Sequence, residues 1–119
     1  MANPKRRPLV LIVEDDALVA VGLAAVVMEE YDVETCLATS VATAEAVLVE
    51  DIDFAFLDVD VIDGNTYRLA RKLCREHVPF VFVSGSDPAR VPGDLLGVPF
   101  LSKPCPAPMI ASVLATALL

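Results

Sequence analysis

Five short apolar runs, separated by stretches of helical character, constrain the fold of this chain more than any other feature. Four of the runs are continuously apolar, which is typical of parallel strands covered on both faces. One run alternates more with polar residues and is predicted to lie toward an edge of the sheet. Strands that alternate with helices indicate a parallel α/β sheet with right-handed crossovers. The runs occupy residues 9–13, 33–38 (the alternating one), 54–58, 80–84 and 99–102.

The segments between the runs predict four helices and one irregular connection. In the third helix, Leu69, Leu73 and Cys74, together with Tyr67, are expected to face the core. The fourth connection, residues 85–99, is rich in proline and glycine, so it predicts one short turn near 94–96 and otherwise loop. The helices are predicted at 17–31, at 41–51 after Ser40 as N-cap, at 65–77, and from near Pro108 onward.

Length and composition indicate one domain over residues 1–119, with residues 1–7 as a flexible tail. The chain has 119 residues, 55% of them hydrophobic, enough for a core without disulfide staples. A net charge of −8 argues against nucleic acid as a partner. No apolar run approaches the roughly 20 residues that a membrane span needs. The three cysteines lack metal-ligand spacing and are interpreted as reduced thiols of a cytoplasmic protein.

Polar side chains stand where the predicted strands end, and the carboxyl ends of parallel strands meet at one edge of the sheet. Carboxylates gathered there repel one another unless a hard cation lies among them, and Mg²⁺ (or Mn²⁺) prefers such oxygen ligands. A hydroxyl and an ammonium nearby would bind the oxygens of a phosphoryl group, with Asp58 as nucleophile toward phosphorus. The residues concerned are Glu14, Asp15, Asp16, Asp58, Asp60, Ser84 and Lys103.

All of these residues except Asp60 also have a simpler interpretation. The acids from Glu14 to Asp16 could cap the first helix, where negative charge is favourable. Asp58 and Ser84 could be turn residues, and Lys103 could be an ordinary surface lysine. Only their joint placement on successive strand ends favours the phosphoryl-transfer site.

The motifs LIVEDD, FAFLDVD, FVFVSG and PFLSKP, in this order and over nearly the whole chain, resemble the receiver domain of two-component response regulators. The resemblance implies a doubly wound, five-stranded (βα)5 α/β fold, a sensor histidine kinase as partner, and a signalling domain that catalyses only its own phosphorylation and dephosphorylation. It assigns Asp58 as phosphoacceptor, Glu14 and Asp15 as metal ligands together with Asp58 and the backbone carbonyl of Asp60, and Ser84, Gly85 and Lys103 as phosphoryl-binding. It also implies Ser84 and Phe100 as switch residues and a cis bond before Pro104, although Phe100 could equally be plain core.

Three departures from the family pattern stand out. The Met-Pro that usually follows the acceptor is missing, the interval from Ser84 to Lys103 is short, and Asp87 stands where a tyrosine would be expected. The endings LDVDVIDG and PFVFVSG resemble the receiver subgroup that partners HWE-type histidine kinases. A degraded fourth helix agrees with the short interval.

Two other functions compete with a receiver. LDVDVID also resembles the motif of haloacid-dehalogenase-type phosphohydrolases, with Asp58 as nucleophile and Asp60 as general acid/base. That family has the motif on its first strand and needs a late acid, and no Asp or Glu follows Asp94 here. A receiver-like binding module without phosphorylation is the other alternative, but acceptor and lysine are both present.

The output of the chain is not marked by a DNA-binding motif. From Met109 to Leu119 only Ser112 and Thr116 are polar. An apolar strip of this last helix is therefore expected to remain exposed, and with the fifth strand it is a candidate interface for a homodimer or a downstream protein.

Overall fold

The computed structural model describes residues 7–47 and 51–118, so most of the predicted flexible tail lies outside the described residues. Five parallel strands form one sheet in the order β2-β1-β3-β6-β7. The alternating run is the edge strand β2, as predicted. The strand bounds are β1 Leu9–Val13, β2 Glu34–Ala38, β3 Phe54–Leu57, β6 Phe80–Ser84 and β7 Phe100–Ser102.

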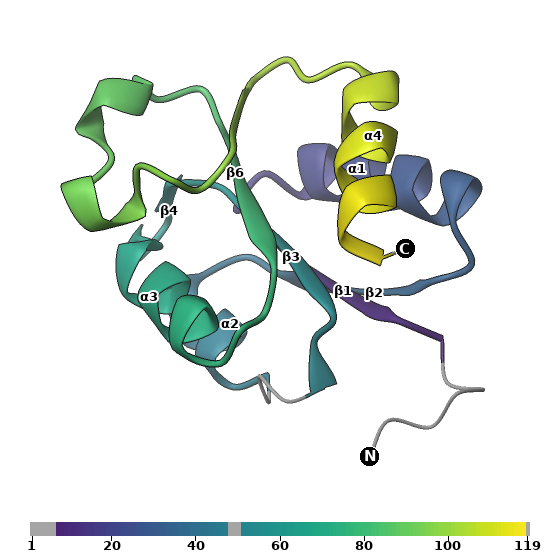
Figure 1. Cartoon of the computed structure of the whole chain (residues 1–119), viewed down its shortest axis with the longest axis horizontal. Coiled ribbons are helices and arrows are strands. Elements are labelled where there is room, and N and C mark those ends of the chain that lie inside the picture. The colour runs from purple at the N-terminus through teal and green to yellow at the C-terminus, as the bar shows by residue number, and fades with distance from the viewer. Residues whose placement is uncertain (1–6, 48–50, 119) are drawn as a thin grey trace.

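Helices cover both faces of the sheet, which confirms the doubly wound fold. Helices α1 (Ala17–Glu30) and α4 (Ala107–Leu118) lie together on one face. Helices α2 (Val41–Glu45) and α3 (Tyr67–Arg75) lie on the other, as Figure 1 shows. None of the described helices is long and apolar enough to cross a bilayer.

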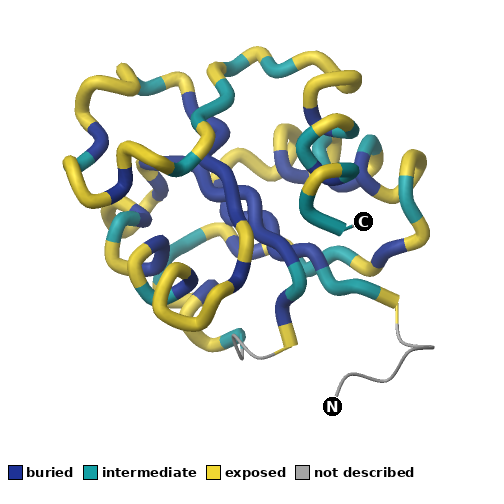
Figure 2. The backbone as a smooth tube through the Cα atoms, in the orientation of Figure 1, coloured by how far each residue is buried: buried dark blue, intermediate teal, exposed yellow. Residues whose placement is uncertain are grey.

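The core consists of two hydrophobic clusters, one on each face of the central strands. Strands β3 and β6 are buried along their whole length, as the dark blue centre of Figure 2 shows. Phe54 and Phe56 pack toward the face covered by α1 and α4, while Phe80 and Phe82 pack toward the other. Burial on both faces explains why these runs are continuously apolar.

The fourth connection contains two short 3₁₀ turns in place of a helix. They span Pro88–Arg90 (η2) and Gly93–Leu95 (η3). The absence of a long helix was predicted, but the expectation of a single turn was wrong. The additional turn, η2, begins where Asp87 accepts a hydrogen bond from the Ala89 amide. Val91 and Leu95 are buried, so the connection contributes to the core.

Other local expectations differ from the structure. Helix α2 ends at Glu45, and residues 48–50 of the predicted 41–51 helix lie outside the described residues. Cys74 is exposed, because Leu69, Ala70 and Leu73 form the buried stripe of α3 and Cys74 lies beyond it. A small hairpin, β4 (Asp60–Val61) with β5 (Gly64–Asn65), was not predicted. Gly64 has a φ of 140°, a conformation that favours glycine.

Candidate functional site

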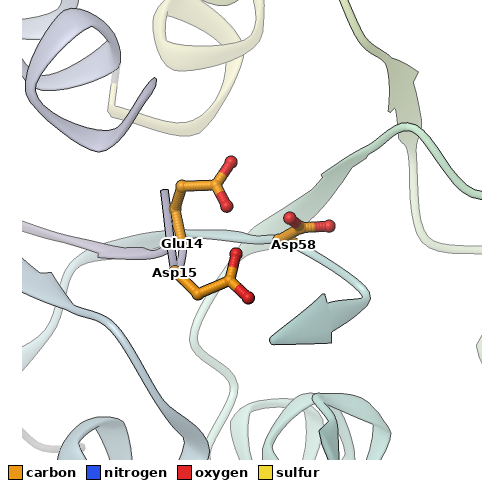
Figure 3. Close-up of side chains that lie close together, drawn as sticks. All are labelled: Glu14, Asp15 and Asp58. Carbon is orange, nitrogen blue, oxygen red and sulfur yellow. The ribbon is translucent and has the colours of Figure 1, made fainter. Parts of the chain in front are cut away.

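Three carboxylates meet where β1 and β3 end side by side. The strands pair in parallel with Val13 opposite Leu57, so the next residues, Glu14 and Asp58, are neighbours. One carboxylate oxygen from each of Glu14, Asp15 and Asp58 lies within 4.8 Å of the others. Figure 3 shows the three side chains around a common space. Glu14 and Asp58 are buried, whereas Asp15 is exposed.

Lys103 lies between the two buried acids. Its Nζ donates to Asp58 Oδ2 at 2.9 Å and also to Glu14 Oε1. The lysine follows β7, where its backbone amide donates to the Ser84 carbonyl. The Lys103–Pro104 peptide bond is cis. One ammonium is therefore shared by two carboxylates that come from different strands.

The charges of this cluster depend on one another. Burial and the neighbouring Asp58 raise the pKa of Glu14, while Lys103 opposes that rise. Burial by itself would lower the pKa of Lys103, but the hydrogen bonds to Glu14 and Asp58 outweigh it and raise that pKa. The ammonium is thus held in its charged form, ready to interact with an anion.

Asp16 has a different role from its two neighbours. Its carboxylate accepts hydrogen bonds from the amides of Leu18 and Val19, which makes it the N-cap of α1. The helix-cap interpretation therefore holds for Asp16, and the site takes Glu14 and Asp15. Consecutive side chains point in different directions where the strand ends. For this reason Asp16 caps the helix while Glu14 and Asp15 join the acidic cluster.

Ser84 is buried where β6 ends, on the strand next to that of Asp58. Its Oγ accepts a hydrogen bond from the Ser86 amide at 3.2 Å, so the turn interpretation of this hydroxyl is also correct. Among the described residues no group accepts the proton of this hydroxyl, which leaves it available for an oxygen of a ligand. Gly85 is exposed, and a Cβ at this position would meet nothing within 4 Å.

The two later acids of the FLDVDVIDG stretch are not part of the cluster of three and have partners of their own. Asp60 Oδ2 accepts from Ser86 Oγ at 2.7 Å and from Arg90 Nη1 at 3.2 Å. The Ser86 hydrogen bond and Arg90 lower the pKa of Asp60. Asp63 accepts from the Val41 and Ala42 amides at 2.7 and 3.1 Å, at the N-terminus of α2.

Sequence reasoning missed Thr66, Ser86 and Arg90. Thr66 is fully buried and its Oγ1 donates to the backbone carbonyl of Asp58 at 2.6 Å. The available signal for Thr66 was a polar residue in the first turn of the helix predicted at 65–77; in the structure it directly precedes α3. No pattern in the sequence indicated a role for Arg90, because its contact with Asp60 depends on how turn η2 folds.

Phe100 lies at the start of β7, half-buried, and its ring centroid is 6.2 Å from that of Phe82. It packs against the core cluster on the α2–α3 face. Packing and a switch role are both compatible with this position.

The donor set fits a hard divalent cation, because all three clustered side chains offer oxygen. The side chain of Asp60 is engaged elsewhere, so its backbone carbonyl is the part left for the predicted contact. A charged ammonium contacts two of these acids, and the end of the adjacent strand carries a hydroxyl; both groups bind phosphoryl oxygens in proteins. The arrangement can therefore hold a metal ion and an anionic group side by side.

Comparisons with protein-family models and with curated proteins found no match. Solved structures do match over nearly the whole chain. SdrG from Sphingomonas melonis Fr1 is 34% identical, with 95% of this chain and 98% of that chain covered and a TM-score of 0.76. The receiver domain of HemR from Leptospira biflexa is 24% identical, with 94% of each covered and a TM-score of 0.79. The receiver domain of the response regulator PhyR from Erythrobacter litoralis is 23% identical, with 98% and 93% covered and a TM-score of 0.80.

Proposed function

We propose that this chain, which belongs to the response regulator receiver domains, accepts a phosphoryl group on Asp58 from a sensor histidine kinase. An oxygen of Asp58 forms a bond to phosphorus while the bond from phosphorus to the donor's imidazole nitrogen breaks. The nitrogen keeps the bonding electron pair. The product is an aspartyl-phosphate, so the domain transmits a signal and is not a conventional enzyme.

The observation that carries the proposal is the position of Lys103. A cation bonded to Asp58 lies where a phosphoryl group attached to that carboxylate would place its oxygens. It can pass from the carboxylate to the new oxygens without a large movement. Ser84, on the adjacent strand, supplies a hydroxyl that we assign to another phosphoryl oxygen, next to Gly85.

Mg²⁺ or Mn²⁺ is the cofactor that we propose, held by Glu14, Asp15, Asp58 and the carbonyl of Asp60. When bound, the ion would neutralise charge on the acids and on the incoming group. The support is the oxygen-only donor set within 4.8 Å. Thr66 contributes by holding the Asp58 backbone carbonyl, which orients the acceptor.

The partner that we propose is a histidine kinase of the HWE type, in the cytoplasm. The motifs around Asp58 and Ser84 support this choice. For output we retain a homodimer or a downstream protein that contacts β7 and α4. The surface of α4 is less apolar than expected: among its described residues Met109 is the one large hydrophobic side chain that is clearly exposed.

A phosphohydrolase that uses Asp58 and Asp60 is not favoured by the structure. The Asp60 carboxylate is bonded to Ser86 and Arg90, away from the role of a general acid/base next to Asp58. The fold is also that of the matched receiver domains.

The test is intact mass after incubation with acetyl phosphate and Mg²⁺, for the wild type and for Asp58→Asn, with phosphate release followed in parallel. We expect one added phosphoryl group in the wild type, lost in the variant and without Mg²⁺. Asp63→Asn is a matched control, because this acid lies in the same stretch but binds the amides of α2. Rapid turnover of varied phosphoesters would support the phosphohydrolase instead, and no modification by acetyl phosphate or by a panel of kinases would support a binding module.

A further inference from the structure

Asp60 adds a negative charge next to a site that must accept an anion. It is two residues beyond Asp58, and two residues of chain span at most about 7 Å. The two Cα atoms are therefore closer than the screening length of about 8 Å at physiological salt, and Ser86 links the Asp60 carboxylate to the hydroxyl of Ser84. An uncompensated Asp60 would therefore repel an incoming phosphoryl group as well as attract a cation.

Two groups from the fourth connection meet this carboxylate. Arg90 Nη1 lies 3.2 Å from Asp60 Oδ2, and Ser86 Oγ donates to the same oxygen at 2.7 Å. Lys103 is already shared by Glu14 and Asp58, so it does not balance Asp60. Among the described residues, Arg90 is the cation that forms an ion pair with Asp60.

Turn η2 sets the position of Arg90. The Asp87 carboxylate accepts from the Ala89 amide at 2.9 Å and starts the turn. At its other end the Tyr67 hydroxyl donates to the Arg90 carbonyl at 3.4 Å. Buried Val91 follows directly and anchors the chain. The backbone of Arg90 is thus fixed while its guanidinium reaches back to the hairpin after β3.

We propose that Arg90 is a positioning residue for phosphorylation, which neutralises the Asp60 carboxylate so that an anionic phosphoryl donor can approach Asp58. Arg90 acts through Asp60 and does not itself contact the phosphoryl group. The irregular fourth connection thereby supplies a positive charge that offsets one of the negative charges at this edge of the sheet. The inference rests on the proposed function, since it concerns the same acceptor.

The experiment is a double-mutant cycle with Arg90→Gln, Asp60→Asn and the two combined. The first readout is the initial rate of phosphorylation by acetyl phosphate with saturating Mg²⁺, followed by intact mass. In this reaction the Asp58 oxygen–phosphorus bond forms, the phosphorus–oxygen bond to acetate breaks, and acetate leaves with the electron pair. The second readout is Mg²⁺ affinity, measured by NMR titration without a phosphodonor.

Arg90→Gln is expected to slow phosphorylation about 3- to 5-fold, the range of a partly exposed ion pair, while Mg²⁺ binds more tightly. In the Asp60→Asn background the same change should have no effect on either quantity. Arg68→Gln is the matched control, because it removes the same charge from an exposed arginine whose pair with Glu45 is 3.9 Å long, and both quantities should stay unchanged.

Three results would overturn the inference. If the double variant stays as slow as Arg90→Gln, Arg90 contacts the phosphoryl group or holds the loop. If Arg90→Gln weakens Mg²⁺ binding as well as phosphorylation, the effect is structural. If Arg90→Gln changes neither quantity, Arg90 has no role.

The failure of the inference can be distinguished from failure of the proposed function. A wild-type chain that acquires no phosphoryl group contradicts the function, and the Mg²⁺ titrations then still decide whether Arg90 balances Asp60. A wild-type chain that is phosphorylated, with a cycle that shows no coupling, contradicts the inference alone.

Discussion

Lys103 is the residue on which the electrostatics of the site depend. It is a single ammonium between two buried carboxylates from separate strands, Glu14 and Asp58. Removing it leaves two like charges next to each other with little solvent, and a buried charge without a partner is costly. A bound Mg²⁺ would neutralise the negative charge of the same two acids, so the ion could replace part of the stabilisation that the lysine provides.

Lys103→Met is expected to destabilise the metal-free chain by about 1–3 kcal/mol, because Glu14 and Asp58 lose their cation. The melting temperature of the variant should rise more with added Mg²⁺ than that of the wild type. Phosphorylation by acetyl phosphate should become much slower. Thermal denaturation with and without Mg²⁺ measures the first two effects, and equal Mg²⁺ responses in the two proteins would contradict this account.

At the scale of elements, the connections after β3 and β6 do more than join strands. The β4–β5 hairpin brings Asp63 to the first amides of α2, and η3 buries Leu95 on the α3 face of the sheet. Arg71 Nε donates to Asp94 at 2.8 Å and ties η3 to α3. Segments that look like loops in the sequence therefore cap a helix and complete the core.

Leu95→Ala should cost about 2–4 kcal/mol in the free energy of unfolding, because it removes a fully buried side chain and leaves a cavity. Leu96→Ala, one residue on but 66% exposed, is the matched control and should change stability by less than about 0.5 kcal/mol. Urea unfolding measures both. Equal effects would mean that η3 does not pack as described.

Asp63→Ala should lower the melting temperature, because the α2 amides of Val41 and Ala42 lose their acceptor. The hydrogen bonds from these amides lower the pKa of Asp63 in the folded chain. The stabilisation is therefore complete above the unfolded pKa of about 3.9 and is lost as the pH falls through the folded pKa. Melting curves of the two proteins should differ at pH 7 and converge below about pH 4. A difference that persists in acid would contradict the assignment.

At the scale of the whole molecule, the two helices on one face differ in the surface that they leave exposed. Helix α1 exposes Leu18, Val21 and Met28, with Leu18 at 85%, whereas on α4 the comparable side chain is Met109 at 50%. The residues of the last helix predict the exposed apolar surface there instead. Ile110 and Leu114 form the face buried on the sheet, as expected, but Val113 and Leu118 are also half-buried against the core, which removes much of the expected strip.

If a homodimer forms through β7 and α4, Met109→Glu should weaken it about tenfold or more, because a charge would be buried in the contact. Leu18→Glu, on the exposed surface of α1, is the matched control and should leave the dimer intact. Sedimentation velocity over a range of concentrations measures both, with and without phosphorylation. A wild-type monomer in both states would exclude the homodimer, and dissociation by Leu18→Glu alone would place the contact on α1.

The parallel sheet, the alternation of strands and helices, and the meeting of Glu14, Asp15, Asp58 and Lys103 at one edge could be predicted from the sequence alone. Continuous apolar runs require strands buried on both faces, and parallel strands must bring their carboxyl ends to one edge. Both constraints follow from local sequence patterns and a general rule of sheet topology, so they apply before the structure is known.

Which acids belong to the site depends on how the chain packs in three dimensions. Asp16 caps α1, Asp63 caps α2, and Asp60 pairs with Arg90 across thirty residues of sequence. Nearby acids carry the same charge and cannot be told apart in the sequence. They differ in role because the backbone directs each side chain toward a different partner. The contact between Asp60 and Arg90 depends on how η2 folds back, a long-range packing event that no local pattern encodes.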